Sequence, residues 1–224
     1  MQKHTNLDSH GIPPLTQTEI DILTRQALQD YAPNCLNHPI KTPVLVVAQG
    51  IAQEHNFKIN LSQKLNDKVK NNIKGCFDLE SNTIFIDEGL NQNSSQFNHI
   101  LAHQLGHAFL HNKLSNDVLS NSSCGKIIDS DNELNQIHEF TTNLRSQIEL
   151  QANKFSTSLL LPEPIFTAVL ESTQRKIGLS RNIGQVLPVS TEDPDFHKLI
   201  HELVLIFETL SPAIKMRLYF LKKL

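Results

Sequence analysis

The sequence predicts a mixed fold in which several helices accompany short strands, two of which form a small antiparallel hairpin. Apolar residues recur at helical spacing in several segments, the clearest of which cover about residues 16–31, 94–111 and 140–161. Two short segments, 75–77 and 83–87, have the pattern of β-strands and are joined by a tight turn at Glu80-Ser81-Asn82. The length of 224 residues is enough for one sizeable domain, with or without a small appendage.

The composition argues against several classes of function. A formal net charge of -3 provides no basic surface for nucleic acid, so we expect no direct binding of DNA or RNA. No apolar run approaches the roughly 20 residues that cross a bilayer, and the N-terminus lacks the apolar core of a signal peptide. The cysteines, 3 in number and widely spaced, are typical of a reducing compartment. These features predict a cytoplasmic protein that does not associate with a membrane.

The N-terminal part is predicted to be helical after a loose arm that ends near residue 15. Thr16 and Glu19 have the spacing of a capping box, which starts a helix that reaches about residue 31. Thr42 and Pro43 have the pattern of an N-cap followed by proline at the first helical position, which predicts a helix over about 43–56. The apolar run 44–47 is also compatible with a buried strand, and periodicity does not decide between the two.

The rest of the chain alternates predicted elements with polar connections. Residues 112–136 are rich in Asn, Ser and Asp and predict a long surface loop, and residues 176–192 predict a linker. The predicted elements are a strand over 57–61, the hairpin over 75–87, a helix over 94–111, a helix over 140–161 that ends at Pro162, and two short helices near 194–209 and 212–223.

The run His103-Gln104-Leu105-Gly106-His107 is the most informative feature of the sequence. Histidines four residues apart lie on one face of a helix and can bind a single metal ion. The run has the pattern of the H-E-x-x-H helix of zinc peptidases with one residue changed. In that pattern the Glu is the general base that takes a proton from the attacking water, whereas the Gln104 side chain has no carboxylate for this task. The run therefore predicts a zinc site and leaves hydrolysis in doubt.

A catalytic zinc site has three protein ligands, so a third ligand is expected on a separate element. Glu149 is the best candidate, and Glu139 and Glu133 are weaker alternatives. Asn153 follows Glu149 by one helical turn, where a short polar side chain can hydrogen-bond the distal nitrogen of a ligand histidine and fix the orientation of its ring. Gly106 is unfavourable within a helix by about 1 kcal/mol, which indicates the close approach of another element or a ligand.

Two segments resemble motifs of the ImmA/IrrE family of metallopeptidases. Residues 100–111 are similar to its "lAHELGHlllH" helix, but Gln104 stands where the family has its catalytic Glu. Residues 149–162 are similar to its "ExqANxFAxxLLmP" motif, with Ser156 in place of the usual Ala. Residues 83–87 resemble the strand that precedes the histidine helix, and the resemblance as a whole covers roughly residues 42–165.

This resemblance implies an α+β fold with a zincin-like core, in which a small twisted sheet packs on the zinc-binding helices and extra helices lie at both ends. It implies Zn²⁺ as the cofactor and His103, His107 and Glu149 as its ligands. Many members cleave a repressor that has a helix-turn-helix domain, so such a repressor is the implied partner. We expect three regions: an N-terminal arm and helix over 1–41, a metallopeptidase domain over 42–175 and a C-terminal helical extension over 176–224.

Gln104 has three interpretations. It is a natural loss that leaves a zinc-binding pseudoprotease, an engineered Glu→Gln change that traps a substrate, or a change for which Asp87 or Glu88 compensates as the base. The loss of a general base typically lowers a rate by about 10²–10⁴.

Two further residues near these motifs have structural interpretations. We expect His111 to interact with the dipole at the C-terminal end of its helix. We expect Cys124 to be an ordinary loop cysteine, with an inhibitory thiolate as the alternative.

Overall fold

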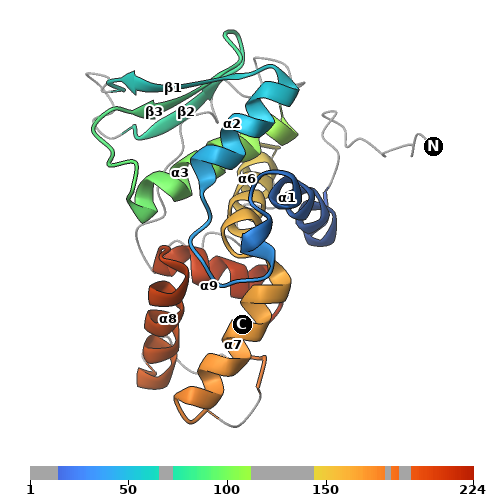
Figure 1. The fold of residues 1–224 in the computed structure, drawn as a ribbon, viewed down its shortest axis with the longest axis vertical. Helices are drawn as coiled ribbons and strands as arrows, with labels where there is room; N and C mark the ends of the chain where they lie inside the picture. Colours follow the sequence, from blue (N-terminus) through green and yellow to red (C-terminus); the bar gives the residue numbers. More distant parts are fainter. Residues whose placement is uncertain (1–14, 66–72, 112–143, 180–182, 187–192) are drawn as a thin grey trace, which may run out of the picture.

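The structure is a computed structural model that describes residues 15–65, 73–111, 144–179, 183–186 and 193–224. Figure 1 shows a small sheet at one end of the molecule, α1 and α6 in the middle, and α7, α8 and α9 at the other end. The α+β class predicted from the sequence is confirmed. The described elements are α1 (Gln17–Tyr31), η1 (Pro33–Leu36), α2 (Val44–His55), β1 (Lys58–Gln63), β2 (Gly75–Asp78), β3 (Thr83–Asp87), α3 (Ser95–Leu110), α6 (Leu144–Leu160), α7 (Glu163–Lys176), α8 (Pro194–Phe207) and α9 (Ser211–Phe220).

The sheet has three strands in the order β1-β3-β2. The predicted hairpin is confirmed, because β2 pairs antiparallel with β3. Asn82 takes a left-handed backbone conformation with φ of 49° in the turn between them, a conformation that Asn tolerates better than most residues. The third strand, β1, pairs in parallel with β3, so the sheet is mixed. Helix α3 packs against β2 and β3, and α2 contacts β1.

Residues 44–47, which are compatible with a helix or a strand in the sequence, begin helix α2. Val44, Val47 and Ile51 are buried at helical spacing, whereas Val46 is 53% exposed. The predicted N-cap is wrong by one residue, because Pro43 occupies the N-cap position and the helix begins at Val44. Thr42 instead donates a hydrogen bond from its hydroxyl to the carbonyl oxygen of Leu159 at 3.2 Å, which ties the start of α2 to the end of α6.

Helix α1 begins as predicted, with a complete capping box between Thr16 and Glu19. A buried polar cluster then joins α1, α6 and α9. Arg217 of α9 is fully buried and donates hydrogen bonds to Asp21 of α1 at 2.7 Å, to Ser158 of α6 at 2.9 Å and to the carbonyl oxygen of Leu161 at 2.8 Å. Both terminal helices thus pack on α6, and the division of the chain into three regions stays a prediction.

One helix is missing from the sequence-based interpretation. Helix α6 ends before Pro162 as predicted, but α7 begins directly after it, at Glu163. Pro164 lies in the first turn of α7, where its missing N–H leaves no helical hydrogen bond unmade. Phe166, Val169 and Leu170 are buried at helical spacing, which is the signal that predicts this helix. The two last helices, α8 and α9, occur where the sequence places them, within two or three residues at their ends.

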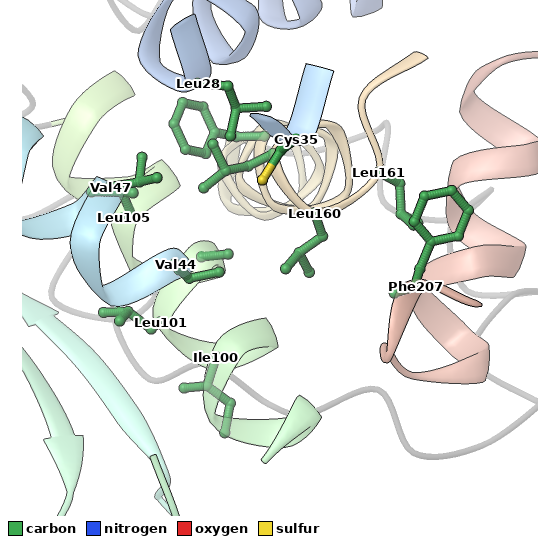
Figure 2. Close-up of a cluster of buried hydrophobic side chains, with 14 of the residues drawn as sticks. Leu28, Cys35, Val44, Val47, Ile100, Leu101, Leu105, Leu160, Leu161 and Phe207 are labelled. Atoms are coloured by element: carbon green, nitrogen blue, oxygen red, sulfur yellow. The ribbon is translucent and has the colours of Figure 1, made fainter. Parts of the chain in front are cut away.

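The hydrophobic core runs through the middle of the molecule and connects these helices. Figure 2 shows Val44 and Val47 of α2 beside Leu101 and Leu105 of α3, with Leu28 of α1 and Leu160 of α6 nearby. These side chains are at most 5% exposed, so α3 is held by apolar contacts on several sides. Within the described residues, no helix is both long enough and apolar enough to cross a bilayer.

Candidate metal site

Helix α3 brings the histidine run into the interior of the protein. Ser94 caps its N-terminus by accepting a hydrogen bond from the backbone N–H of Phe97 at 3.0 Å. Every residue from Phe97 to Ala108 is buried, because the sheet and α2 cover part of the helix and α6 covers another part. The histidines of the run are therefore held between α3 and α6 and do not lie on a solvated helix face.

Three ligand-type atoms converge at this position. His103 Nε2 lies 3.0 Å from His107 Nε2 and 3.1 Å from a carboxylate oxygen of Glu149, and the same oxygen lies 3.6 Å from His107 Nε2. Zinc bound tetrahedrally at 2.0–2.1 Å from such atoms requires separations of about 3.3–3.4 Å between them. The three distances lie on both sides of this value, so the cluster has the chemistry and the size to hold a zinc ion.

Asn153 orients the His103 ring. The Asn153 side-chain oxygen lies 3.0 Å from His103 Nδ1, so this nitrogen carries the proton and donates to it. The opposite nitrogen, Nε2, then has a free electron pair directed at His107 and Glu149. This is the arrangement expected for a metal-ligating histidine, whose second nitrogen is normally held by a hydrogen-bond acceptor.

Gly106 allows α6 to approach the metal-site face of α3. A Cβ atom at position 106 would lie 3.1 Å from the Ala152 Cα atom and 3.2 Å from its carbonyl oxygen. Ala152 belongs to the same turn of α6 as Glu149 and Asn153. The close approach predicted from Gly106 therefore occurs, and the neighbouring element is α6, the helix that carries Glu149 as the candidate for the third ligand.

The charge state of the cluster also suits a cation. Burial is the largest influence on His107 and lowers its pKa, so this imidazole is neutral at pH 7. Burial raises the pKa of Glu149, but the neighbouring His107 and His103 side chains lower it by more, and the net shift is downward, so the carboxylate is ionised at pH 7. An ionised carboxylate beside a neutral imidazole is the form in which these groups bind metal.

Gln104 occupies the position next to the first histidine and is fully buried. Its side chain packs towards strand β2, because a Cβ atom at Gly75 would lie 3.3 Å from Gln104 Cγ. Within the described residues, neither the oxygen nor the nitrogen of its amide has a hydrogen-bond partner. A buried amide without a partner typically costs about 1–3 kcal/mol of stability.

The two residues predicted as alternative bases, Asp87 and Glu88, lie in different environments. Asp87 is buried and accepts hydrogen bonds from the backbone N–H groups of Leu65 at 2.9 Å and Gly89 at 3.0 Å. The hydrogen bond from Leu65 is the largest influence on the Asp87 carboxyl, and its pKa is lowered, which makes it a weak base. Glu88 is exposed to solvent. The hydrogen bonds and the lowered pKa of Asp87 thus disfavour compensation for Gln104 by this carboxylate.

The prediction for His111 is correct in part. His111 is the C-cap residue of α3, as expected of a helix-end residue, but it is only 1% exposed and its Nε2 lies 3.0 Å from the side-chain oxygen of Gln151. Burial, followed by the charge of His107, lowers the pKa of His111 to about 3, so it is neutral at pH 7. The position after α3 is covered by α6, a contact that the sequence around His111 does not reveal.

Several other predictions fall outside the described residues. They concern the alternative ligands Glu133 and Glu139, the loop cysteine Cys124, the whole of the predicted surface loop, the N-terminal arm and the first turn of the helix predicted from residue 140.

A helix with two histidines that could bind a metal, a second helix with a glutamate and an asparagine, and a small mixed sheet together have the pattern of a zinc-peptidase-type protein. The chain matches the family model of the IrrE N-terminal-like domain, Peptidase_M78, over residues 55–193. It therefore belongs to this family of zinc metallopeptidase type, which confirms the resemblance drawn from the motifs. A comparison with curated proteins finds no match.

Proposed function

We propose that this chain is a zinc-binding, endopeptidase-type protein that acts on a protein partner and whose hydrolytic step is impaired or abolished by Gln104. The observation that carries the proposal is the cluster of His103 Nε2, His107 Nε2 and the Glu149 carboxylate, with Asn153 holding His103 in the tautomer suited to a metal. When bound there, Zn²⁺ would supply a Lewis acid that polarises a carbonyl group and makes water more acidic.

Each residue of the site then has a defined task. His103 and His107 provide two neutral nitrogen ligands on one helix, and Glu149 provides a negative oxygen ligand from another. Asn153 keeps the His103 ring in place. Gln104 is positioned where the family has its general base, and its amide can accept or donate a hydrogen bond but cannot take up a proton at neutral pH. Water or a peptide group can therefore be held beside Gln104 without being deprotonated by it.

A helix-turn-helix repressor is the partner that this proposal favours. Support comes from membership of the family alone, since many of its members act on such repressors. The protein would then control transcription through its partner and would need no nucleic-acid surface of its own, in keeping with the net charge of -3.

The experiment is a comparison of the wild-type chain with the Gln104→Glu variant, both loaded with zinc. The substrates are a fluorescently labelled, unfolded casein and the repressors encoded next to the gene. We expect the variant to cleave at least one substrate about 10²–10⁴ times faster than the wild type. A Gln104→Glu/Glu149→Gln double variant is the matched control, because it has the base but lacks the acidic ligand.

The alternative function is a zinc-binding pseudoprotease that regulates its partner by binding without cleavage. The specific observation in its favour is that the Asp87 carboxylate already accepts backbone hydrogen bonds and is therefore poorly suited to replace the missing base. Tight binding of a repressor by the wild-type chain, together with no cleavage by either form, would favour this alternative. Absence of bound zinc in the wild-type chain would refute both.

A further inference from the structure

His107 differs from His103 in one respect that matters for a metal ligand. His103 has an acceptor for its Nδ1–H group, namely Asn153. His107 Nδ1 is buried and has no hydrogen-bond partner among the described residues. When the Nε2 atom of a neutral imidazole binds a metal, the Nδ1 atom carries the proton and needs an acceptor. Something must therefore accept the proton of His107 Nδ1 in the metal-bound protein.

His111 has the complementary requirement. Its Nε2 donates to the side-chain oxygen of Gln151 at 3.0 Å, which leaves Nδ1 with a free electron pair. This Nδ1 atom is also buried and has no partner within the described part of the chain. The His107 and His111 rings are neighbours one helical turn apart, with centroids separated by 5.5 Å and planes inclined by 51°.

We propose that His111 is a positioning residue for the metal site, and that its Nδ1 atom, which has no direct partner in this structure, accepts the Nδ1–H of His107 through one water molecule in the metal-bound protein. The inference rests on the proposed zinc site. It assigns to His111 the role for His107 that Asn153 has for His103. His111 itself binds no metal in this arrangement, because its Nε2 atom is directed at Gln151.

A single helix, α6, would then provide the acidic ligand and the side chains that orient both histidine rings. Helix α6 provides Glu149 as a ligand, Asn153 as the acceptor for His103 and Gln151 as the acceptor that sets the tautomer of His111. These residues occupy alternate positions of a single segment, and Gly106 lets that segment lie against α3. A shift of α6 would disturb the acidic ligand and the orientation of both histidine rings together.

Two isosteric variants separate this role from a purely structural one. In His111→Asn the side-chain oxygen replaces Nδ1 and the contact with Gln151 is lost. In His111→Gln the amide nitrogen replaces Nε2, so the contact with Gln151 is kept and the acceptor for His107 is lost. His111→Leu removes both groups. The readouts are the zinc dissociation constant from competition with a chromophoric chelator and the visible spectrum of the protein loaded with Co²⁺.

We expect His111→Leu and His111→Gln to bind zinc about 10–100 times more weakly than the wild type, with an altered Co²⁺ spectrum. His111→Asn should stay within a few-fold of the wild type. The opposite order, with Gln restoring affinity and Asn failing to, would overturn the inference and assign His111 to the contact with Gln151. Equal affinity in all forms would also overturn it.

A measurement on the wild-type chain tests the same hydrogen-bond arrangement without relying on variants that could misfold. Long-range ¹H–¹⁵N correlation spectra of the metal-free protein should show the Nε2–H tautomer for His111, whereas an Nδ1–H tautomer overturns the inference. If the wild-type chain binds no zinc, the proposed function fails by that result, and the tautomer of His111 still tests the hydrogen-bond arrangement independently.

Discussion

Replacement of Arg217 by Met is the sharpest test of how the terminal helices are attached to the metal-site helix. The Arg217 guanidinium is fully buried and hydrogen-bonds Asp21, Ser158 and the Leu161 carbonyl. Methionine fills a similar volume without a charge. The substitution therefore leaves the Asp21 carboxylate, which is 7% exposed, without its cationic partner in the interior.

The expected magnitude follows from the cost of an uncompensated buried charge. Breaking a buried ion pair by removing one partner typically destabilises a protein by about 3–5 kcal/mol. For a chain of 224 residues, each kcal/mol lowers the melting temperature by about 2–4 °C. We therefore expect Arg217→Met to lower the melting temperature by roughly 6–20 °C.

The assay is thermal and urea unfolding followed by circular dichroism, with two controls. Arg175→Met removes an exposed arginine that pairs with Glu171 at 3.4 Å, and it should cost less than about 1 kcal/mol. Asp21→Asn/Arg217→Met removes both charges and should be less destabilised than Arg217→Met alone. A loss below about 1 kcal/mol for Arg217→Met, or equal losses for the single and double variants, would refute the reasoning.

Three further predictions concern the site. Gly106→Ala gains about 1 kcal/mol of helix propensity but forces a methyl group against the Ala152 backbone, at a cost of about 1–3 kcal/mol, so urea unfolding should show a net loss and zinc binding should weaken. Asn153→Leu should lower zinc affinity about 10–100-fold in a chelator competition, and an unchanged affinity would contradict the role assigned to Asn153. Burial, followed by the charge of His103, lowers the pKa of His99 to about 4, so the unfolded chain takes up a proton at higher pH than the folded one. The metal-free protein should therefore lose stability as the pH falls from about 6.5 to 4. His99 should account for about 2 kcal/mol of the loss in unfolding free energy between pH 7 and 5, and the His99→Leu variant should not show this part of the loss.

The success of the sequence-based predictions depends on how local each feature is. The capping box of Thr16 and Glu19 and the β2–β3 hairpin involve residues a few positions apart, and both occur as predicted. Helix α7 is also a local feature, but the sequence-based prediction ends the helical region at Pro162, which marks only the boundary between two helices. The choice between helix and strand for residues 44–47 required knowledge of which faces are covered.

The sequence by itself determined the chemistry of the site, because the metal-ligating residue types and the missing carboxylate at Gln104 are properties of the residues. It also determined that His103 and His107 share a helix face, since helical periodicity places residues four apart on one side. Whether these histidines face a third ligand was decided by the tertiary structure. Glu149 is 42 residues beyond His107, and only the packing of α6 on α3 brings its carboxylate within reach.

The tertiary structure alone also decided the roles of His111 and Arg217. Both have the pattern of ordinary polar residues near helix ends, where charge and solvent exposure are the usual expectation. Packing of α6 against α3 makes His111 a neutral, buried residue, and packing of α9 against α6 makes Arg217 a buried cation that requires Asp21. The physical reason is that the burial of a side chain depends on which distant segment packs over it. A local stretch of sequence does not specify that segment.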